Sequence, residues 1–290
     1  MQVSKPVLVK TLKKVVSFIP KLKSSSTAST VIVEPLQDSI RLSLSYPEAA
    51  MQTTVGALSE PTEDQLRMTG PQFLSIVSSA DREIEFSADE TFATIRSGSS
   101  VWKEPMPSGD VTPIEFPDEA ACTVNTYSLL TSINTVKYAL DSDNVRPALY
   151  MVDIVDGRAR ACNGFQYHES DNKIEGLTFA IPGGMVDSFA TVLRYFDGDI
   201  EFAHDDDFYY FRNNDDLITI HKVSSHFPDL DRLLVRPLKS EVPALLKVDK
   251  AKLIKAVGRV KLVLDESYPY VELHISKSEV IVRGTQKSGA

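Results

Sequence analysis

Apolar residues recur along this chain at two spacings, one typical of helices and one typical of strands. Between residues 6 and 19, Leu8, Leu12 and Val15 lie at helical intervals, and lysines fall on the opposite side. This pattern predicts an amphipathic helix that turns one face toward a core. Pro6 supports the assignment, because proline suits the first turn of a helix.

Short strands follow this helix, and the same order then returns along the chain. Three strands are predicted at residues 31–33, 40–44 and 51–55, where apolar or alternating runs are separated by turn residues. Further helices are predicted at residues 71–79, 126–140, 185–196 and 250–264. Predicted strands follow each of these helices in turn. They lie at 84–86 and 92–96 after the first, at 149–155 and 159–162 after the second, at 200–203, 208–212 and 217–222 after the third, and at 270–275 and 280–283 after the fourth. The repetition indicates an internally repeated α+β architecture and not an enzyme built on a single core.

Two proline-containing connections divide the repeats into domains. One runs from Pro105 to Pro117 and the other from Pro237 to Pro243. We predict two domains with two repeats each, at residues 1–117 and 118–240. Residues 241–290 are predicted to form a partial third domain of about one repeat.

The formal charge of the 290-residue chain is −9, but the charge is unevenly distributed. Residues 1–33 contain lysines and no carboxylate, and residues 247–261 contain a single aspartate among lysines and an arginine. Residues 197–216, in contrast, are strongly acidic. The basic charge is therefore concentrated in two predicted helices, where it favours an anionic partner.

Composition disfavours several classes of protein. No apolar stretch approaches the roughly 20 residues that span a bilayer, and the N-terminal residues lack the pattern of a secretory signal. Cys122 and Cys162 are the only cysteines, so neither a zinc site nor a disulfide framework is expected. A reducing cytoplasm fits best, and we predict no cofactor and no metal.

Four short segments carry a family resemblance through their order, their spacing and their places in the repeats. They are Ile-Arg-Ser-Gly at 95–98, Asn-Val-Arg-Pro-Ala-Leu at 144–149, Ala-Cys-Asn-Gly-Phe at 161–165 and Phe-Pro-Asp-Leu-Asp-Arg-Leu-Leu at 227–234. With them, nearly the whole chain resembles the bacterial DNA polymerase III β sliding clamps.

The resemblance implies an α+β DNA clamp fold, in which helices of repeated helix-plus-strand units line a ring and antiparallel sheets lie outside. Such a protein is not an enzyme. It would encircle duplex DNA and tether the replicative polymerase; its other partners would be the clamp loader, further proteins with a clamp-binding motif, and copies of itself. A sliding protein needs attraction to phosphates that is independent of sequence. The candidate DNA contacts are Lys10, Lys13, Lys14, Lys137, Arg146, Arg194, Lys252, Lys255 and Arg259.

The resemblance also implies a pocket on the second domain that binds a short apolar peptide of each client. Apolar anchors in a preformed groove give such peptides their affinity. The residues carried over to this pocket are Leu149, Cys162, Gly164, Phe165, Gln166, Tyr167, Pro228, Arg232 and Leu233. Phe165, Gln166 and Tyr167 depart from the family's pattern of His-Arg-Leu, so the peptide preference is expected to differ.

The third domain of the family has two repeats, whereas residues 241–290 predict about one. Two expectations remain open, a fragment or a naturally shortened clamp. In a shortened clamp, the strand at 280–283 would pair with another subunit, because folded proteins normally cover a sheet edge.

Two other functional classes remain open. One is a clamp-fold scaffold that recruits protein partners without encircling DNA, and the other is an unrelated enzyme with repeated α+β units. The first helix is also compatible with a solvated face or a membrane-surface helix. Asp205, Asp206 and Asp207 invite a metal site, but a turn before the next strand is the commoner setting for such a run. Asn163 and Gly164 favour a tight turn over a catalytic loop.

Overall fold

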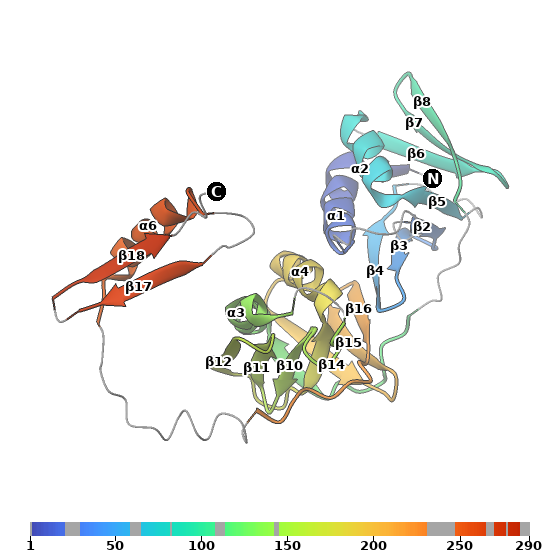
Figure 1. The fold of residues 1–290 in the computed structure, drawn as a ribbon. Coiled ribbons are helices and arrows are strands. Elements are labelled where there is room, and N and C mark those ends of the chain that lie inside the picture. The colour runs from blue at the N-terminus through green and yellow to red at the C-terminus, as the bar shows by residue number, and fades with distance from the viewer. Residues whose placement is uncertain are drawn as a thin grey trace. The chain divides into compact units, whose positions relative to one another are not determined.

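The computed structural model places the chain in two compact units, Met1–Pro228 and Asp229–Ala290 (Figure 1). The structure describes residues 2–20, 30–58, 65–81, 83–107, 114–141, 145–230, 247–264, 270–276 and 278–284.

The first unit consists of repeats with the order strand, helix and three strands. The first repeat comprises β1 (Gln2–Ser4), α1 (Lys5–Ser17), β2 (Thr30–Pro35), β3 (Ser39–Ser45) and β4 (Ala49–Gly56). The second comprises β5 (Leu66–Thr69), α2 (Gly70–Ser79), β6 (Glu83–Ala88), β7 (Phe92–Ser97) and β8 (Ser100–Pro105). The third comprises β9 (Cys122–Asn125), α3 (Thr126–Val136), the short helix η1 (Lys137–Ala139), β10 (Met151–Val155), β11 (Arg158–Cys162) and β12 (Tyr167–Lys173). The fourth comprises β13 (Phe179–Pro182), α4 (Gly183–Val192), η2 (Leu193–Tyr195), β14 (Asp199–His204), β15 (Phe208–Asn213) and β16 (Asp216–His221).

The predicted repetition is confirmed. Strands β1, β5, β8, β9, β12 and β13 were not predicted, and two of them, β8 and β12, share a physical explanation. Strands β8 and β12 lie at the ends of their sheets, each hydrogen-bonded to a single neighbour. The sequence of β12 is Tyr-His-Glu-Ser-Asp-Asn-Lys, and only Ser170 in it is buried. An edge strand is often polar, and its partner strand supplies the pairing. Hydrophobic periodicity therefore does not reveal it.

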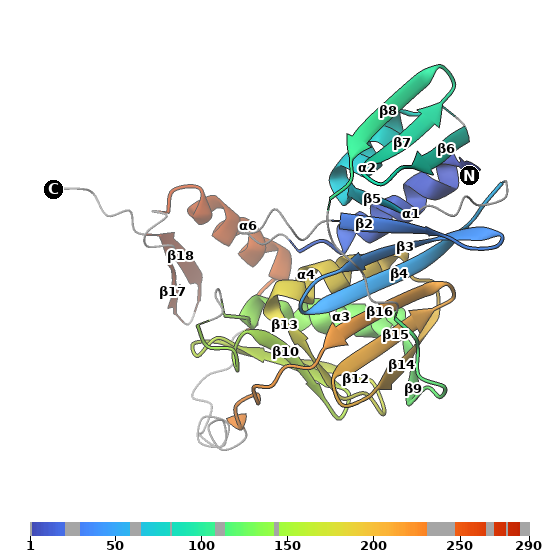
Figure 2. The ribbon, with the colours of Figure 1, turned by 90° about the vertical axis from the view of Figure 1, so that its right-hand side faces the viewer.

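An eight-stranded antiparallel sheet joins the first two repeats to the last two. Its order is β5-β2-β3-β4-β16-β15-β14-β9, most of which can be followed in Figure 2. The joint is the pairing of β4 with β16, from Ala49 opposite Ile220 to Gln52 opposite Leu217. Four-stranded sheets, β1-β6-β7-β8 and β12-β11-β10-β13, complete the unit. The predicted boundary near residue 117 lies between β8 and β9, and the sheet continues across it.

Helices α1 to α4 turn their apolar stripes toward these sheets and contact one another. Helix α1 packs against α2 and α4, and α3 packs against α4. On α1, Leu8, Leu12 and Val15 are fully buried, as the helical spacing predicted.

Aromatic rings fill the core between α4 and the eight-stranded sheet. The Phe179 ring centroid lies 5.0 Å from that of Phe211 and 5.6 Å from that of Phe202. Phe189 on α4 lies 4.9 Å from Phe211 in the same way. All four side chains are essentially inaccessible to solvent. Such a cluster buries a large apolar area and fixes how the helix lies on the sheet.

The second unit contains α6 (Lys250–Lys261), β17 (Val271–Ile275) and β18 (Val280–Gly284). Asp249 caps α6, because its carboxylate accepts a hydrogen bond of 2.9 Å from the Lys252 amide. Strands β17 and β18 form an antiparallel pair, and α6 lies against β18. Among the described residues, this sheet has two strands, so each has one edge without a described neighbour. No described residue of α6 is buried.

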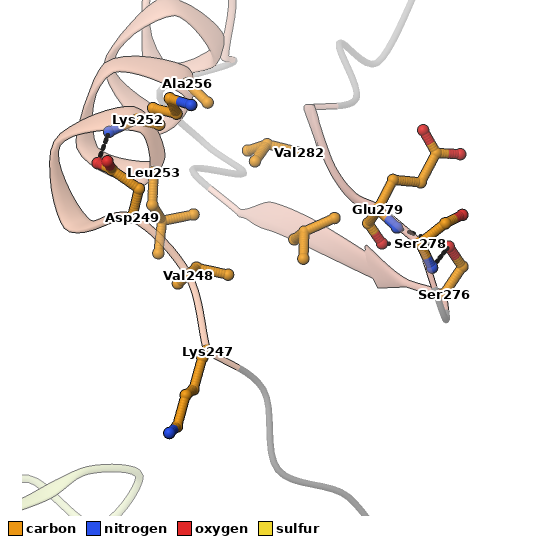
Figure 3. A pocket seen from close by; sticks show the side chains of 11 residues that line it. Lys247, Val248, Asp249, Lys252, Leu253, Ala256, Ser276, Ser278, Glu279 and Val282 are labelled. Carbon is orange, nitrogen blue, oxygen red and sulfur yellow. Dashed lines mark hydrogen bonds between the residues drawn. The ribbon is translucent and has the colours of Figure 1, made fainter.

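A shallow cavity of about 490 Å³ lies between α6 and the strand pair (Figure 3). Val248 and Leu253 face Val282 across it, while Lys247 points away. The lining mixes apolar with polar and charged residues, and the polar residues of the turn, Ser276 and Ser278, lie at its far end.

Because of the aromatic cluster, we predict a large loss of stability when one of its rings is truncated. Phe211→Ala should lower the free energy of unfolding by about 3–5 kcal/mol, through lost transfer energy and the cavity left behind. Phe165→Ala is the matched control, because the Phe165 side chain is 93% exposed and should change stability by less than about 0.5 kcal/mol. Urea unfolding followed by far-ultraviolet circular dichroism measures both. Equal losses would show that the cluster does not carry the stability of this unit.

Candidate functional site

The outward face of α1 presents free lysines. Lys10 and Lys13 are exposed, on the side opposite the buried stripe of Leu8 and Leu12. Lys10 also lines a cavity of about 470 Å³ together with Tyr195 of η2. The structure thus brings α1 next to η2, where Arg194 is exposed.

Lys14 lies on the same helix but is not free. Its ammonium group pairs with the Asp216 carboxylate at the start of β16 and lies 3.4 Å from the Thr53 hydroxyl of β4. The Lys14 side chain is 15% exposed and that of Asp216 is 9% exposed. This ion pair therefore ties α1 to the joint between β4 and β16, and the ammonium is not available to a phosphate.

Lys137 is also engaged by a carboxylate. Its ammonium lies 2.9 Å from Asp187 on α4 and 5.8 Å from the ring centroid of Tyr138. The Asp187 side chain is largely exposed. The helical surface at this point thus carries a negative charge next to a positive one.

Exposed tyrosines on this surface were missed by the sequence analysis. Tyr127 is 76% exposed and Tyr138 is 73% exposed. With Thr131 and Thr135, also exposed, they form an uncharged stripe along α3 and η1. The spacing of these residues, at intervals of three and four, was a usable signal, but a search for lysine and arginine passes over it.

Arg146 lies at the predicted peptide pocket and not on the helices. Its guanidinium is 2.6 Å from the Asp141 carboxylate and donates a hydrogen bond of 3.2 Å to the Asn163 carbonyl. Gly164, with φ of +89°, approaches it closely, since a Cβ there would lie 3.0 Å from Arg146 Nη1 and 4.0 Å from Leu149 Cδ1. The structure therefore gathers Arg146, Leu149 and Gly164.

The turn between β11 and β12 is held by a set of hydrogen bonds. The Asn163 side-chain oxygen accepts from the amides of Phe165 and Gln166, at 3.0 and 2.9 Å. The Gly164 amide donates to Cys162 Sγ at 3.3 Å. The interpretation of Asn163 and Gly164 as a tight turn is confirmed, and Phe165 extends from it into solvent. Tyr167, at the start of β12, is partly buried.

Phe227, the residue before Pro228, contacts Arg160 of β11. The Arg160 guanidinium lies 4.8 Å from the Phe227 ring centroid and 2.8 Å from the Asp153 carboxylate. Burial raises the pKa of Asp153, and its bond to Arg160 opposes that shift. Arg160 and Cys162 belong to β11, the strand that ends at the turn. The Phe227 ring therefore packs against a residue of this strand. Arg232 and Leu233 lie outside the described residues.

The remaining predicted cations belong to the second unit. Lys252, Lys255 and Arg259 are exposed on α6. Their spacing places them along the helix surface, as the sequence indicated.

The acidic run before β15 is a turn, as its position suggested. The Asp205 carboxylate accepts from the amides of Asp207 and Phe208, at 2.8 and 2.7 Å. Among the described residues, no group of three or more His, Cys, Asp or Glu side chains is arranged to hold a metal ion. None of the described helices is long and apolar enough to cross a membrane.

Comparison with known proteins gives no match by sequence. No protein-family model matches the chain, and no curated protein matches it. Solved structures, however, match over almost its whole length. A DNA polymerase III β sliding clamp from Bartonella birtlesii has a TM-score of 0.80 at 18% identity, covering 97% of this chain and 79% of that one.

Clamps from other bacteria give the same result. The β subunit from Pseudomonas aeruginosa has a TM-score of 0.77 at 16% identity, covering 98% of this chain and 85% of that one. That from Thermotoga maritima has a TM-score of 0.72 at 19% identity, covering 98% and 84%. The chain has the fold of a bacterial sliding clamp. The predicted α+β clamp fold is confirmed, while the low identities leave the function of the individual residues to be argued from the geometry.

Because of the Lys14–Asp216 pair, we predict that the neighbouring lysines of α1 contribute unequally to the free energy of unfolding. Lys14→Met should lower the free energy of unfolding by about 2 kcal/mol or more, because Asp216 is left as a buried, unpaired carboxylate. Lys10→Met and Lys13→Met should each change it by less than about 0.5 kcal/mol. The double variant Lys14→Met/Asp216→Leu should recover much of the loss, since an apolar pair replaces a buried ion pair at little cost. Equal stability of the three single variants would contradict the assignment.

Proposed function

We propose that this protein is a sliding clamp, a ring-forming subunit that encircles duplex DNA and tethers a replicative polymerase. The observation that carries the proposal is the clamp fold itself, matched over 97% of the chain. In that fold, the surface formed by α1 to α4 is the one that faces DNA, and Lys10, Lys13 and Arg194 are exposed on it. Their attraction to phosphates does not depend on base sequence, which permits sliding.

The role needs no chemistry from the protein. Retention depends on topology, so a modest number of phosphate contacts is sufficient. Of the nine candidate contacts, Lys14, Lys137 and Arg146 are engaged by carboxylates. We therefore assign the DNA surface to Lys10, Lys13 and Arg194 in the first unit and to Lys252, Lys255 and Arg259 in the second. The clamp loader and the polymerase are the expected protein partners, in the cytoplasm.

The experiment that tests the proposal is retention on closed DNA. Once loaded, the protein should remain on circular DNA and be lost when the circle is linearised. The mass of the assembled particle in solution should correspond to a closed ring of copies of the chain. Binding that is indifferent to linearisation would contradict encirclement.

A second function is favoured by the charges on the helical surface. Asp187 next to Lys137, and the uncharged stripe from Tyr127 to Tyr138, weaken the attraction of this surface for DNA. A clamp-fold scaffold that recruits proteins without encircling DNA would be consistent with such a surface. Partner binding that is unaffected by DNA topology would identify this function.

The proposed DNA surface predicts how the affinity for DNA depends on salt concentration. Replacing Lys10, Lys13, Lys252 and Lys255 by alanine should reduce DNA retention, and the log–log dependence of affinity on salt should become less steep by about 0.9 for each phosphate that is no longer neutralised. Lys103→Ala with Lys173→Ala is the control, since these exposed lysines belong to the edge strands β8 and β12. An unchanged slope in the folded variant would show that the lysines of α1 and α6 do not face DNA.

The peptide pocket predicts a separate effect on client binding. Leu149→Asp should weaken binding of a polymerase-derived peptide by about 2 kcal/mol or more, as expected for a central apolar anchor. Phe165→Ser should also weaken it and cannot unfold the protein, because Phe165 is almost fully exposed. Val101→Asp, an exposed position on β8, is the control for an added charge. Isothermal titration of the peptide measures binding, and unchanged affinity in both Leu149→Asp and Phe165→Ser would place the pocket elsewhere.

A further inference from the structure

The repeats of the first unit complete one another in pairs. Each begins with a leading strand, the one before its helix, and this strand joins the sheet of the neighbouring repeat. The first and second repeats exchange their leading strands, since β1 pairs with β6 and β5 pairs with β2. The third and fourth repeats do the same, since β9 pairs with β14 and β13 pairs with β10. A repeat of this kind therefore needs a second repeat to complete its sheet.

The exchange buries the same position in each of these four repeats. The residue two places before the helix is apolar and at most 2% exposed in every case, and these residues are Val3, Met68, Val124 and Ile181. Each lies opposite an apolar residue on the first strand after the helix of the neighbouring repeat. Those partners are, in the same order, Ile84, Val31, Ile200 and Val152.

The second unit carries a fifth repeat, in which the corresponding positions are exposed. Val248 stands two residues before α6 and is 44% exposed. Asp249 has the extended backbone of a strand, with φ of −69° and ψ of 117°, like the residues before α1 and α3. On β17, Leu273 is 49% exposed, although its neighbour Val282 on β18 faces α6. Among the described residues, no strand pairs with residues 247–249 or with the outer edge of β17.

Strand register shows where a leading strand fits on β17. The turn between β17 and β18 joins paired residues five positions apart, as does the turn between β2 and β3. Counted from this turn, Val271 on β17 occupies the place that Val31 occupies on β2. Val31 lies opposite Met68 of the second repeat's leading strand. By the same geometry, Val271 is the partner of a residue two places before a helix, which in the fifth repeat is Val248.

The number of repeats indicates which repeat takes this place. Among the described residues, the first four repeats are paired with one another, and the fifth shares a sheet with none of them. The fifth repeat is thus left over in every copy of the chain, with the same exposed residues and the same open edge. Two such repeats complement each other, because a two-fold axis makes every contact occur twice.

We propose that two copies of the chain associate through their fifth repeats, residues 247–249 of each pairing with β17 of the other. The two α6 helices then pack side by side. Ile254, the fifth residue of α6, is 61% exposed, whereas Val9 and Leu74 at the same place in α1 and α2 pack against the core. Burial of these exposed apolar side chains favours the association. This contact goes beyond the clamp function proposed above and does not depend on DNA.

Disulfide trapping in the full chain tests the exchange. Val248→Cys and Val271→Cys are prepared as separate proteins, each with Cys122→Ser, since the other native thiol, Cys162, is buried. We expect oxidation of the mixture to give at least about fivefold more covalent dimer than either protein alone, because residues opposite each other in a strand pair are within disulfide reach. Ile281→Cys, on the opposite face of β18, replaces Val271→Cys as the control.

A second variant tests the packing of the helices with the same readout. Ile254→Asp, introduced into both cross-linking proteins, should lower the yield of covalent dimer at least about fivefold, because it places a charge at the centre of the contact. Ile281→Asp is the matched control and should leave the yield unchanged. The cross-link reports on this contact alone, even where other surfaces associate in a ring. Equal yields with Val271→Cys and Ile281→Cys, or no loss in Ile254→Asp, would overturn the proposal and assign this face to a different partner.

Discussion

The pairing of β4 with β16 is the interaction on which the rest of the first unit depends. It joins two pairs of repeats into one sheet through backbone hydrogen bonds, from Ala49 opposite Ile220 to Gln52 opposite Leu217. Without it, β4 and β16 would each present an open edge, which folded proteins avoid. The connection between β8 and β9 supports the joint, since the Gln52 side chain donates to the Ile114 carbonyl. The Lys14–Asp216 ion pair adds a contact between α1 and β16 at this joint.

This joint also determines the charge of the helical surface. Because β16 begins next to α1, the Asp216 carboxylate takes up the ammonium of Lys14 and removes it from solvent. The neighbouring lysines, Lys10 and Lys13, remain exposed, although Lys10 lies one turn before Lys14 on the same side of the helix. In the sliding clamp that we propose, the attraction to phosphates must not depend on base sequence. A surface of a few exposed lysines among hydroxyl groups is suited to that proposed role.

The two faces of the sheet carry different chemistry because side chains alternate along each strand. On β15, Phe211 joins the core, whereas Phe208 and Tyr210 face outward next to Phe116. The inner face buries its aromatic rings against α4. The outer face leaves part of its rings accessible, close to carboxylates. One strand thereby serves the stability of the fold on one side and carries partly accessible aromatic rings on the other.

Local sequence patterns determined the repeats, the buried stripes of the helices and the turns at residues 163–166 and 205–208. These features depend on residues a few positions apart, and helical and strand periodicity report on them directly. The tertiary structure alone decided which charges are free. Lys14 meets a carboxylate 202 residues away, and Arg146 lies next to Gly164 because a turn between two strands approaches it. The tertiary structure also formed a cavity on the face of the eight-stranded sheet away from the helices, since only strand register places Ser45, Ala50 and Thr219 in one row next to Tyr210. The edge strands β8 and β12 belong to the same category, because their pairing comes from neighbouring strands and not from their own apolar residues.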